Sequence, residues 1–161
     1  MKYIEVFEDK IPGIRDLALE IFPETYKNLL ASTQIEYMLD MMYSEQSLAQ
    51  QFSEGCQFFI IYDNDKAIGY GSISVSESTS SLHKIYVNHS YQGKGVGKEF
   101  ISFLENESKN NGAQKIQLYV KRDNIAQFFY QKLGYQVIAE VDKAIGNGYF
   151  MNDYIMEKLL G

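Results

Sequence analysis

Residues 81–100 read SLHKIYVNHSYQGKGVGKEF, and the other predictions for this chain start from them. Apolar Leu82, Ile85 and Val87 predict a strand, and a tight loop and a helix that begins near Gly95 should follow it. Glycines in the loop let the backbone adopt positive φ angles and let an anion come close, because no Cβ stands in the way. A helix that begins there presents unpaired N–H groups and the positive end of its dipole. The stretch therefore predicts a binding site for phosphate or diphosphate.

The loop fits neither of two common phosphate-binding patterns. The dinucleotide pattern G-x-G-x-x-G fails because Lys98 stands at its third glycine, and the P-loop pattern fails because no Gly-Lys-Ser/Thr closes the run. Residues 92–97, QGKGVG, instead match the pattern (R/Q)-x-x-G-x-(G/A). A solvent-exposed turn is the alternative interpretation. It would explain the glycines, but not the apolar strand before them and the helix start after them.

A second motif lies downstream, separated from the first by one predicted helix and one predicted strand. Residues 124–135, NIAQFFYQKLGY, resemble the pattern N-x-x-A-x-x-(F/L)-Y-x-K-x-G-F, slightly shortened at its start. In this order the two patterns resemble the signatures of the GCN5-related N-acetyltransferase (GNAT) superfamily. Residues 153–158 look like the last strand of that family. The resemblance covers residues 56–160 well and the N-terminal helices only loosely.

Composition and charge exclude several other classes. A length of 161 residues predicts one domain, residues 1–161, with a sizeable core. One cysteine and two histidines make neither an internal disulfide nor a recognisable metal site. The net charge of −6 argues against nucleic acid and favours a cationic small molecule, with acidity for solubility as the alternative. No apolar run could span a membrane and no secretory signal is present, so we expect a cytoplasmic protein.

The periodicity of apolar residues predicts an α/β chain in one layered architecture. Strands are expected at 2–7, 56–62, 67–75, 82–88, 114–120, 135–141 and 149–158, and helices at 12–22, 34–43, 44–52, 95–110 and 124–134. The resemblance adds the topology. It implies a GNAT-like mixed, mostly antiparallel, seven-stranded sheet flanked by helices and splayed between the fourth and fifth strands.

Three local features carry expectations of their own. Pro23 should end the first helix, because a residue that precedes proline disfavours the helical conformation. Gly69 and Gly71 lie inside a strand and suggest a bulge or a close approach of another backbone. Residues 76–80, SESTS, should form a polar loop that is the most mobile internal segment.

The resemblance implies acetyl-CoA as the cosubstrate, with no metal. The pantetheine arm would lie between strands 82–88 and 114–120, and amides of residues 92–97 would hold the diphosphate. Asn124 would contact the pantetheine arm, and Lys132 would reach a phosphate of CoA, unless it is an ordinary solvated lysine. The cofactor-binding residues implied are Ile85, Tyr86, Val87, Gln92, Gly93, Lys94, Gly95, Val96, Gly97, Lys98, Asn124 and Lys132.

The chemistry implied is direct attack of an amine on the thioester. A backbone N–H near Val87 could stabilise the oxyanion. Tyr130 stands where the family usually places the acid that protonates the departing thiolate, and a core tyrosine is the alternative. His83 is the candidate base, because it titrates near neutrality and its strand parity places it with Ile85. An ordinary surface histidine is an equally good interpretation, since Ser81 replaces a glutamate found in many members.

The acceptor is harder to infer from the sequence. Residues 21–26, IFPETY, resemble the polyamine (PaiA-type) branch of the family. Glu24, Glu36 and Asp40, with nearby tyrosines, could surround an alkylammonium group, and a solvated helix face is the alternative. We expect a small amine such as a polyamine. A protein or peptide N-acetyltransferase and a non-catalytic CoA-binding regulatory module, which need not retain Tyr130, are the alternatives; homodimers are common in the family.

Overall fold

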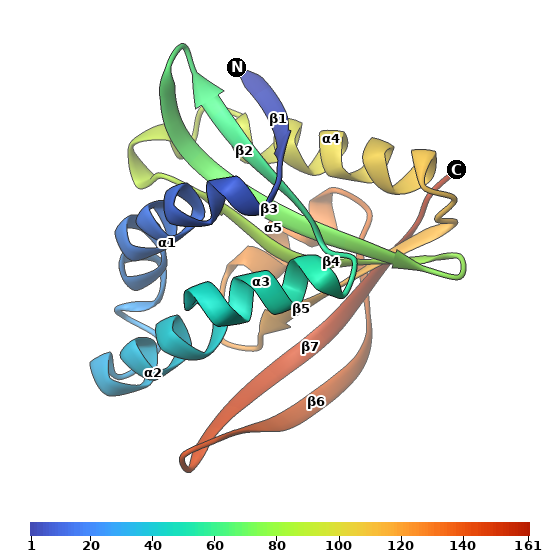
Figure 1. Ribbon diagram of the computed structural model, residues 1–161. Coiled ribbons are helices and arrows are strands. Elements are labelled where there is room, and N and C mark those ends of the chain that lie inside the picture. Colours follow the sequence, from blue (N-terminus) through green and yellow to red (C-terminus); the bar gives the residue numbers. More distant parts are fainter.

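The computed structural model describes residues 1–161, and its strands form one sheet in the order β1-β2-β3-β4-β5-β7-β6 (Figure 1). All neighbouring strands are antiparallel except β4 and β5, which are parallel. The strands are β1 (Lys2–Val6), β2 (Gln57–Asp63), β3 (Lys66–Ser76), β4 (Thr79–Val87), β5 (Lys115–Lys121), β6 (Gln136–Gly146) and β7 (Tyr149–Leu159). The helices are α1 (Ile11–Tyr26), α2 (Ser32–Tyr43), α3 (Glu45–Ser53), α4 (Val96–Asn110) and α5 (Ala126–Lys132). The predicted α/β class and mixed seven-stranded sheet are confirmed.

Helices cover both faces of the sheet, and each face has its own apolar core. Along β2, Phe58 and Ile60 pack with α1, α2 and α3, whereas Phe59 and Ile61 pack with α4. This division follows from the strand itself, because successive side chains point to opposite faces. It explains why the sequence of β2 is apolar almost throughout. None of the helices combines the length and apolar character needed to cross a membrane.

The parallel pairing of β4 with β5 is short. It joins Thr79–Leu82 to Lys115–Leu118 and then stops, although both strands continue. Beyond Leu82, β4 therefore separates from β5. The predicted splay between the fourth and fifth strands is confirmed.

A β-bulge interrupts β4 where the splay begins. Ser72 of β3 pairs with Lys84, and Ile73 pairs with Leu82, so His83 is an extra residue without a partner of its own. A bulge shifts the alternation of side chains by one position. Simple alternation between the two faces of the sheet therefore cannot be counted along β4 from one side of His83 to the other.

This bulge corrects the predicted orientation of His83. Leu82, and not His83, shares a face with Ile85 and Val87, since all three pack into the core beside α4. His83 instead forms a hydrogen bond with the hydroxyl of Ser74, at 2.7 Å. The prediction assumed regular alternation of side chains along the strand and so placed His83 on the wrong face. A bulge depends on pairing with β3, and the sequence of β4 alone does not show it.

The prediction that Pro23 ends the first helix is wrong. α1 continues through Pro23 to Tyr26. The last turn persists because Phe22 and Tyr26 pack together in the core, with ring centroids 4.7 Å apart, and because Thr25 donates its hydroxyl to the carbonyl of Ile21 at 2.9 Å. These contacts offset the hydrogen bond that proline cannot donate.

The loop predicted at residues 76–80 is a tight hairpin instead. Only Glu77 and Ser78 lie between β3 and β4, and Glu77 has a φ of 57°. Positive φ is typical of short hairpin turns. The hydroxyl of Ser80 lies 2.7 Å from that of Ser108, which ties the hairpin to α4.

The predicted close approach at the two strand glycines is confirmed. A Cβ on Gly69 would lie 2.6 Å from the carbonyl oxygen of Tyr86, and one on Gly71 would lie 2.9 Å from that of Lys84. Only glycine lets β3 and β4 approach this closely.

Lys84 on β4 is a buried cation without an ion pair. Its exposed fraction is 5%, and it donates a hydrogen bond to the Gln51 side chain at 2.6 Å. Its ammonium lies 5.5 Å from the ring centroid of Tyr43 and 5.6 Å from that of Phe58, close enough for cation–π attraction. Burial nevertheless lowers the pKa of Lys84 from 10.5 to about 8.

We predict that Lys84 makes stability depend on pH above neutrality. Between pH 8 and pH 10.5 the unfolded lysine binds a proton that the folded one lacks, so the free energy of unfolding rises with pH. The rise should be about 1 kcal/mol per pH unit in the middle of that range. Urea unfolding of the wild type and of Lys84→Met, at a series of pH values, measures it. Parallel curves for the two proteins would contradict the prediction.

Candidate active site

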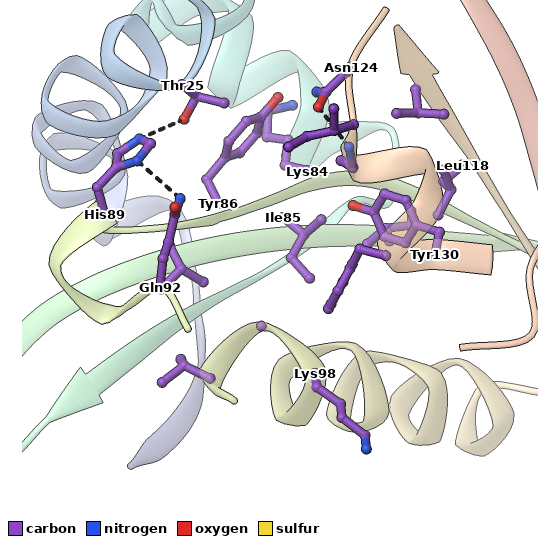
Figure 2. Close-up of a pocket in the computed structure, with 18 of the residues that line it drawn as sticks. Thr25, Lys84, Ile85, Tyr86, His89, Gln92, Lys98, Leu118, Asn124 and Tyr130 are labelled. Carbon is purple, nitrogen blue, oxygen red and sulfur yellow. Dashed lines mark hydrogen bonds between the residues drawn. The ribbon is translucent and has the colours of Figure 1, made fainter. Parts of the chain in front are cut away.

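A cleft of about 600 Å³ opens where β4 and β5 part (Figure 2). Its wall includes Leu118 and Val120, which belong to the core beside α4, and also Tyr26 and Tyr86, which pack with α1. Because these two cores lie on opposite faces of the sheet, the cleft passes through the sheet. A long ligand could therefore enter from the side of α4 and meet a second molecule on the side of α1.

The segment before α4 forms one end of the cleft. Gly93 and Gly95 have φ angles of 77° and 80°, which favour glycine. The consecutive backbone N–H groups from Gly93 to Lys98 have no acceptor within the protein. A Cβ on Gly93 or Gly95 would meet no atom within 4 Å, so the space before these residues is open. The predicted anion site thus has both its donors and the room that a ligand needs.

His89 holds this segment against α1. Gln92 Nε2 lies 3.0 Å from His89 Nδ1, and His89 Nε2 lies 3.4 Å from the hydroxyl of Thr25 (Figure 2). Because the Gln92 amide nitrogen can only donate, Nδ1 is the acceptor and Nε2 carries the proton. A positioning role for His89 fits this pair of hydrogen bonds.

The charge of the wall suits an anion. No aspartate or glutamate lines the cleft, whereas Lys84, Lys98 and Lys121 do. Figure 2 shows the side chain of Lys98 extending away from the other labelled residues. Lys94 lies outside the wall, 5.6 Å from the ring centroid of Tyr91, and Lys132 is exposed on α5 outside it as well. The structure therefore brings together every predicted cofactor-binding residue except these two lysines.

Tyr130 projects from α5 across the cleft from Ile85 (Figure 2). Its ring packs against Phe129 and Tyr135, with centroids 5.4 Å and 5.7 Å away, and its hydroxyl has no hydrogen-bond partner in the protein. Burial, reinforced by Tyr26, raises the pKa of Tyr130 well above its usual value. The hydroxyl is therefore protonated at neutral pH and free to donate into the cleft.

Asn124 and His83 both lie in the cleft wall. The Asn124 side-chain oxygen accepts a hydrogen bond from the Ala126 N–H at 2.9 Å, which fixes the turn that leads into α5. His83 is exposed on β4, and partial desolvation together with the charge of Lys84 lowers its pKa. Its ring is therefore neutral at pH 7.

The acidic side chains expected around an amine do not reach the cleft. Glu24, Glu36 and Asp40 are exposed on α1 and α2, and Glu24 pairs with Lys27. Tyr26 lines the cleft instead, with its hydroxyl 3.0 Å from that of Tyr86. The sequence suggested tyrosines and carboxylates together, but the three carboxylates lie on exposed faces of α1 and α2, so of these groups only a tyrosine lines the cleft. No group of three or more His, Cys, Asp or Glu side chains could hold a metal ion.

Comparison with known proteins agrees with this geometry. A family model described as "Acetyltransferase (GNAT) domain" matches residues 26–158. The spermidine N(1)-acetyltransferase of Thermoplasma acidophilum is 26% identical over 149 residues, which cover 89% of this chain and 87% of that protein. An uncharacterized N-acetyltransferase of Bacillus subtilis, YobR, is 36% identical over 84 residues, and the match spans 52% of this chain and 34% of YobR.

The fold recurs in a solved structure. The crystal structure of PaiA N-acetyltransferase from Thermoplasma acidophilum in complex with coenzyme A superimposes with a TM-score of 0.80 and 24% sequence identity, over 98% of both chains. The order of the strands, the splay between β4 and β5 and the glycine loop at α4 are all present here. With the family model matching most of its length, the chain belongs to the GNAT family of acetyltransferases.

Proposed function

We propose that the protein is an N-acetyltransferase that moves the acetyl group of acetyl-CoA directly to a primary amine of a small molecule. The observation that carries this proposal is the run of N–H groups from Gly93 to Lys98, which lack acceptors and face a cleft through the sheet. A diphosphate accepts hydrogen bonds from such groups and is stabilised by the dipole of α4. The names of the similar proteins support the same activity.

In this proposal the pantetheine arm of CoA follows the free edge of β4 at residues 85–87. Beyond Leu82 this edge has no neighbouring strand, so its backbone groups can pair with the amides of pantetheine. Asn124 contributes its amide nitrogen from the opposite wall, because its oxygen is already bonded to Ala126. The diphosphate lies against residues 92–98, and the thioester reaches the opening beside Tyr130.

We predict that Gly95→Ala weakens CoA binding at least about 10-fold. The new methyl group would occupy the open space before the loop, and a side chain at a φ of 80° also strains the loop by about 1–2 kcal/mol. Isothermal titration calorimetry with coenzyme A measures the loss. Gly112→Ala at the other end of α4 is the matched control, because its φ is 90° and its Cβ also meets nothing within 4 Å. Equal CoA affinities for the two variants would count against the site.

The transfer itself needs two proton movements. The amine lone pair attacks the thioester carbon, the carbon–sulfur bond breaks, and the sulfur leaves as a thiolate that must gain a proton. The wall holds no serine or cysteine, and Thr25, its one threonine, donates its hydroxyl to Ile21, which favours direct transfer without an acyl-enzyme. We assign the protonation of the thiolate to Tyr130, whose hydroxyl is protonated and has no competing partner.

Replacement of Tyr130 by phenylalanine should lower kcat by about 100-fold, the usual contribution of a general acid, and leave the affinity for CoA nearly unchanged. Steady-state kinetics and calorimetry on the same preparation separate these two effects. Tyr119→Phe is the control, since Tyr119 also lines the cleft but is 58% exposed. A wild-type kcat for Tyr130→Phe would remove this residue from the mechanism.

The attacking amine must first lose a proton, because an alkylammonium has a pKa of about 10. We propose His83 as the group that takes this proton, through a water molecule. Its lowered pKa keeps the ring neutral, and only Nε2 is engaged, by Ser74, so Nδ1 is available. In this account the protonation of His83 sets the acidic limb of the pH profile of kcat/KM.

The acceptor that we propose is a small alkylamine such as a polyamine. A net charge of −6 attracts cationic molecules, and one relative, similar over 89% of this chain, is named for spermidine. Thiol release from acetyl-CoA over polyamines, amino acids, aminoglycosides and peptides tests this directly. We expect the highest kcat/KM with a polyamine. Release with peptides alone would contradict a small acceptor, and CoA binding without release for any amine would contradict an enzyme.

A further inference from the structure

Asp153 on β7 is a buried carboxylate without a partner. Its exposed fraction is 6%, and its Oδ1 atom is buried and forms no hydrogen bond. No lysine, arginine or histidine lies within ion-pair distance of it. Buried polar atoms are normally satisfied, and a buried charge is normally paired. Asp153 therefore indicates a cationic group that the protein itself does not supply.

Asp153 is not itself part of the cleft wall but lies beside it, on the α1 side of the sheet. It pairs across the sheet with Lys121, which is part of the cleft wall. It has the same strand parity as Met151, which packs into the core beside α1, so it faces that side of the sheet. Its negative charge contributes to the raised pKa of Tyr26, another wall residue.

The nearby cations are already engaged or too far away to pair with it. The Lys121 ammonium lies 3.1 Å from Asp123, and the Arg122 guanidinium pairs with Glu140 and Asp142. Burial raises the pKa of the Asp153 carboxyl group. The more distant positive charges of Lys121, Arg122 and Lys143 oppose this shift.

We propose that Asp153 binds a second, non-reacting ammonium group of the acceptor, so that diamines and polyamines are preferred to monoamines. This inference rests on the proposed acetyltransferase function. The reacting amine must lie between β4 and β5 beside Tyr130, whereas Asp153 is on the strand beyond β5. β7 lies about 4.8 Å beyond β5, so the carbon chain between the two amines must cross β5, which a chain of several carbons can do. Asp153 thus takes the role that the sequence suggested for exposed Glu24, Glu36 and Asp40.

A comparison of cadaverine, a five-carbon diamine, with pentylamine, its monoamine counterpart, tests this assignment. In the wild type, kcat/KM should be higher for cadaverine. Asp153→Asn should lower it about 10-fold or more for cadaverine, mainly through KM, because a charge-assisted hydrogen bond is lost. The values for pentylamine and the KM of acetyl-CoA should not change. Equal losses with both amines, or no loss with cadaverine, would overturn the proposal.

Asp142→Asn is the matched control, because it removes the same charge from an exposed position on the adjacent strand and should leave both amines unaffected. Thermal melting adds a second readout. Since Asp153 has no partner to lose, Asp153→Asn should melt at or above the wild-type temperature, and a clear decrease would indicate a structural ion pair instead.

Direct titration separates this inference from the proposed function. If the protein binds CoA but acetylates neither amine, the proposed enzymatic activity is wrong. Calorimetry with cadaverine on the CoA-saturated protein then still tests whether Asp153 binds an ammonium group. Cadaverine binding that Asp153→Asn abolishes would support that role. Binding that is unaffected by the substitution, or no binding to the wild type, would overturn it.

Discussion

The functional half of this protein depends on where the hydrogen bonding between β4 and β5 stops. The two strands pair only as far as Leu82 and Leu118, and each then continues without the other. Separation of two central strands leaves backbone groups unpaired in the middle of a sheet, which is unfavourable unless a ligand or water satisfies them. The same separation opens the cleft and points it at the first turn of α4. The protein thus has a binding cleft because β4 and β5 pair along only part of their length.

The cleft offers different chemistry on the two sides of the sheet. On the side of α4 it presents backbone donors and no carboxylate, a setting suited to a polyanionic tail. On the side of α1 it presents the hydroxyls of Tyr26 and Tyr86, and Asp153 faces the same side from the strand next to β5. In the proposed reaction these two environments receive an anionic donor and a cationic acceptor, and the thioester crosses between them. Tyr130 lines the cleft where the thioester would pass from one side of the sheet to the other. Its raised pKa keeps its hydroxyl protonated until a thiolate forms.

Much of this was accessible from local sequence. Apolar periodicity identified the buried stripe of α1 and the doubly buried β2, and the glycines marked the loop before α4, because these features depend on residues close together in the chain. Features that depend on distant partners were not accessible. The bulge at His83 is set by β3, the persistence of α1 past Pro23 by packing around Tyr26, and the burial of Asp153 by its position in the sheet. Lys132 matched a motif, yet it points to solvent.

The central claim is that the amides of Gly93 to Lys98 are unpaired in the free protein and are satisfied by the diphosphate of CoA. Site-resolved amide hydrogen exchange, with and without coenzyme A, measures this most directly. We expect rapid exchange at these residues in the free protein and slowing of at least about 10-fold when CoA is bound, because amides that gain hydrogen bonds are protected. Unchanged exchange there at saturating CoA would contradict it.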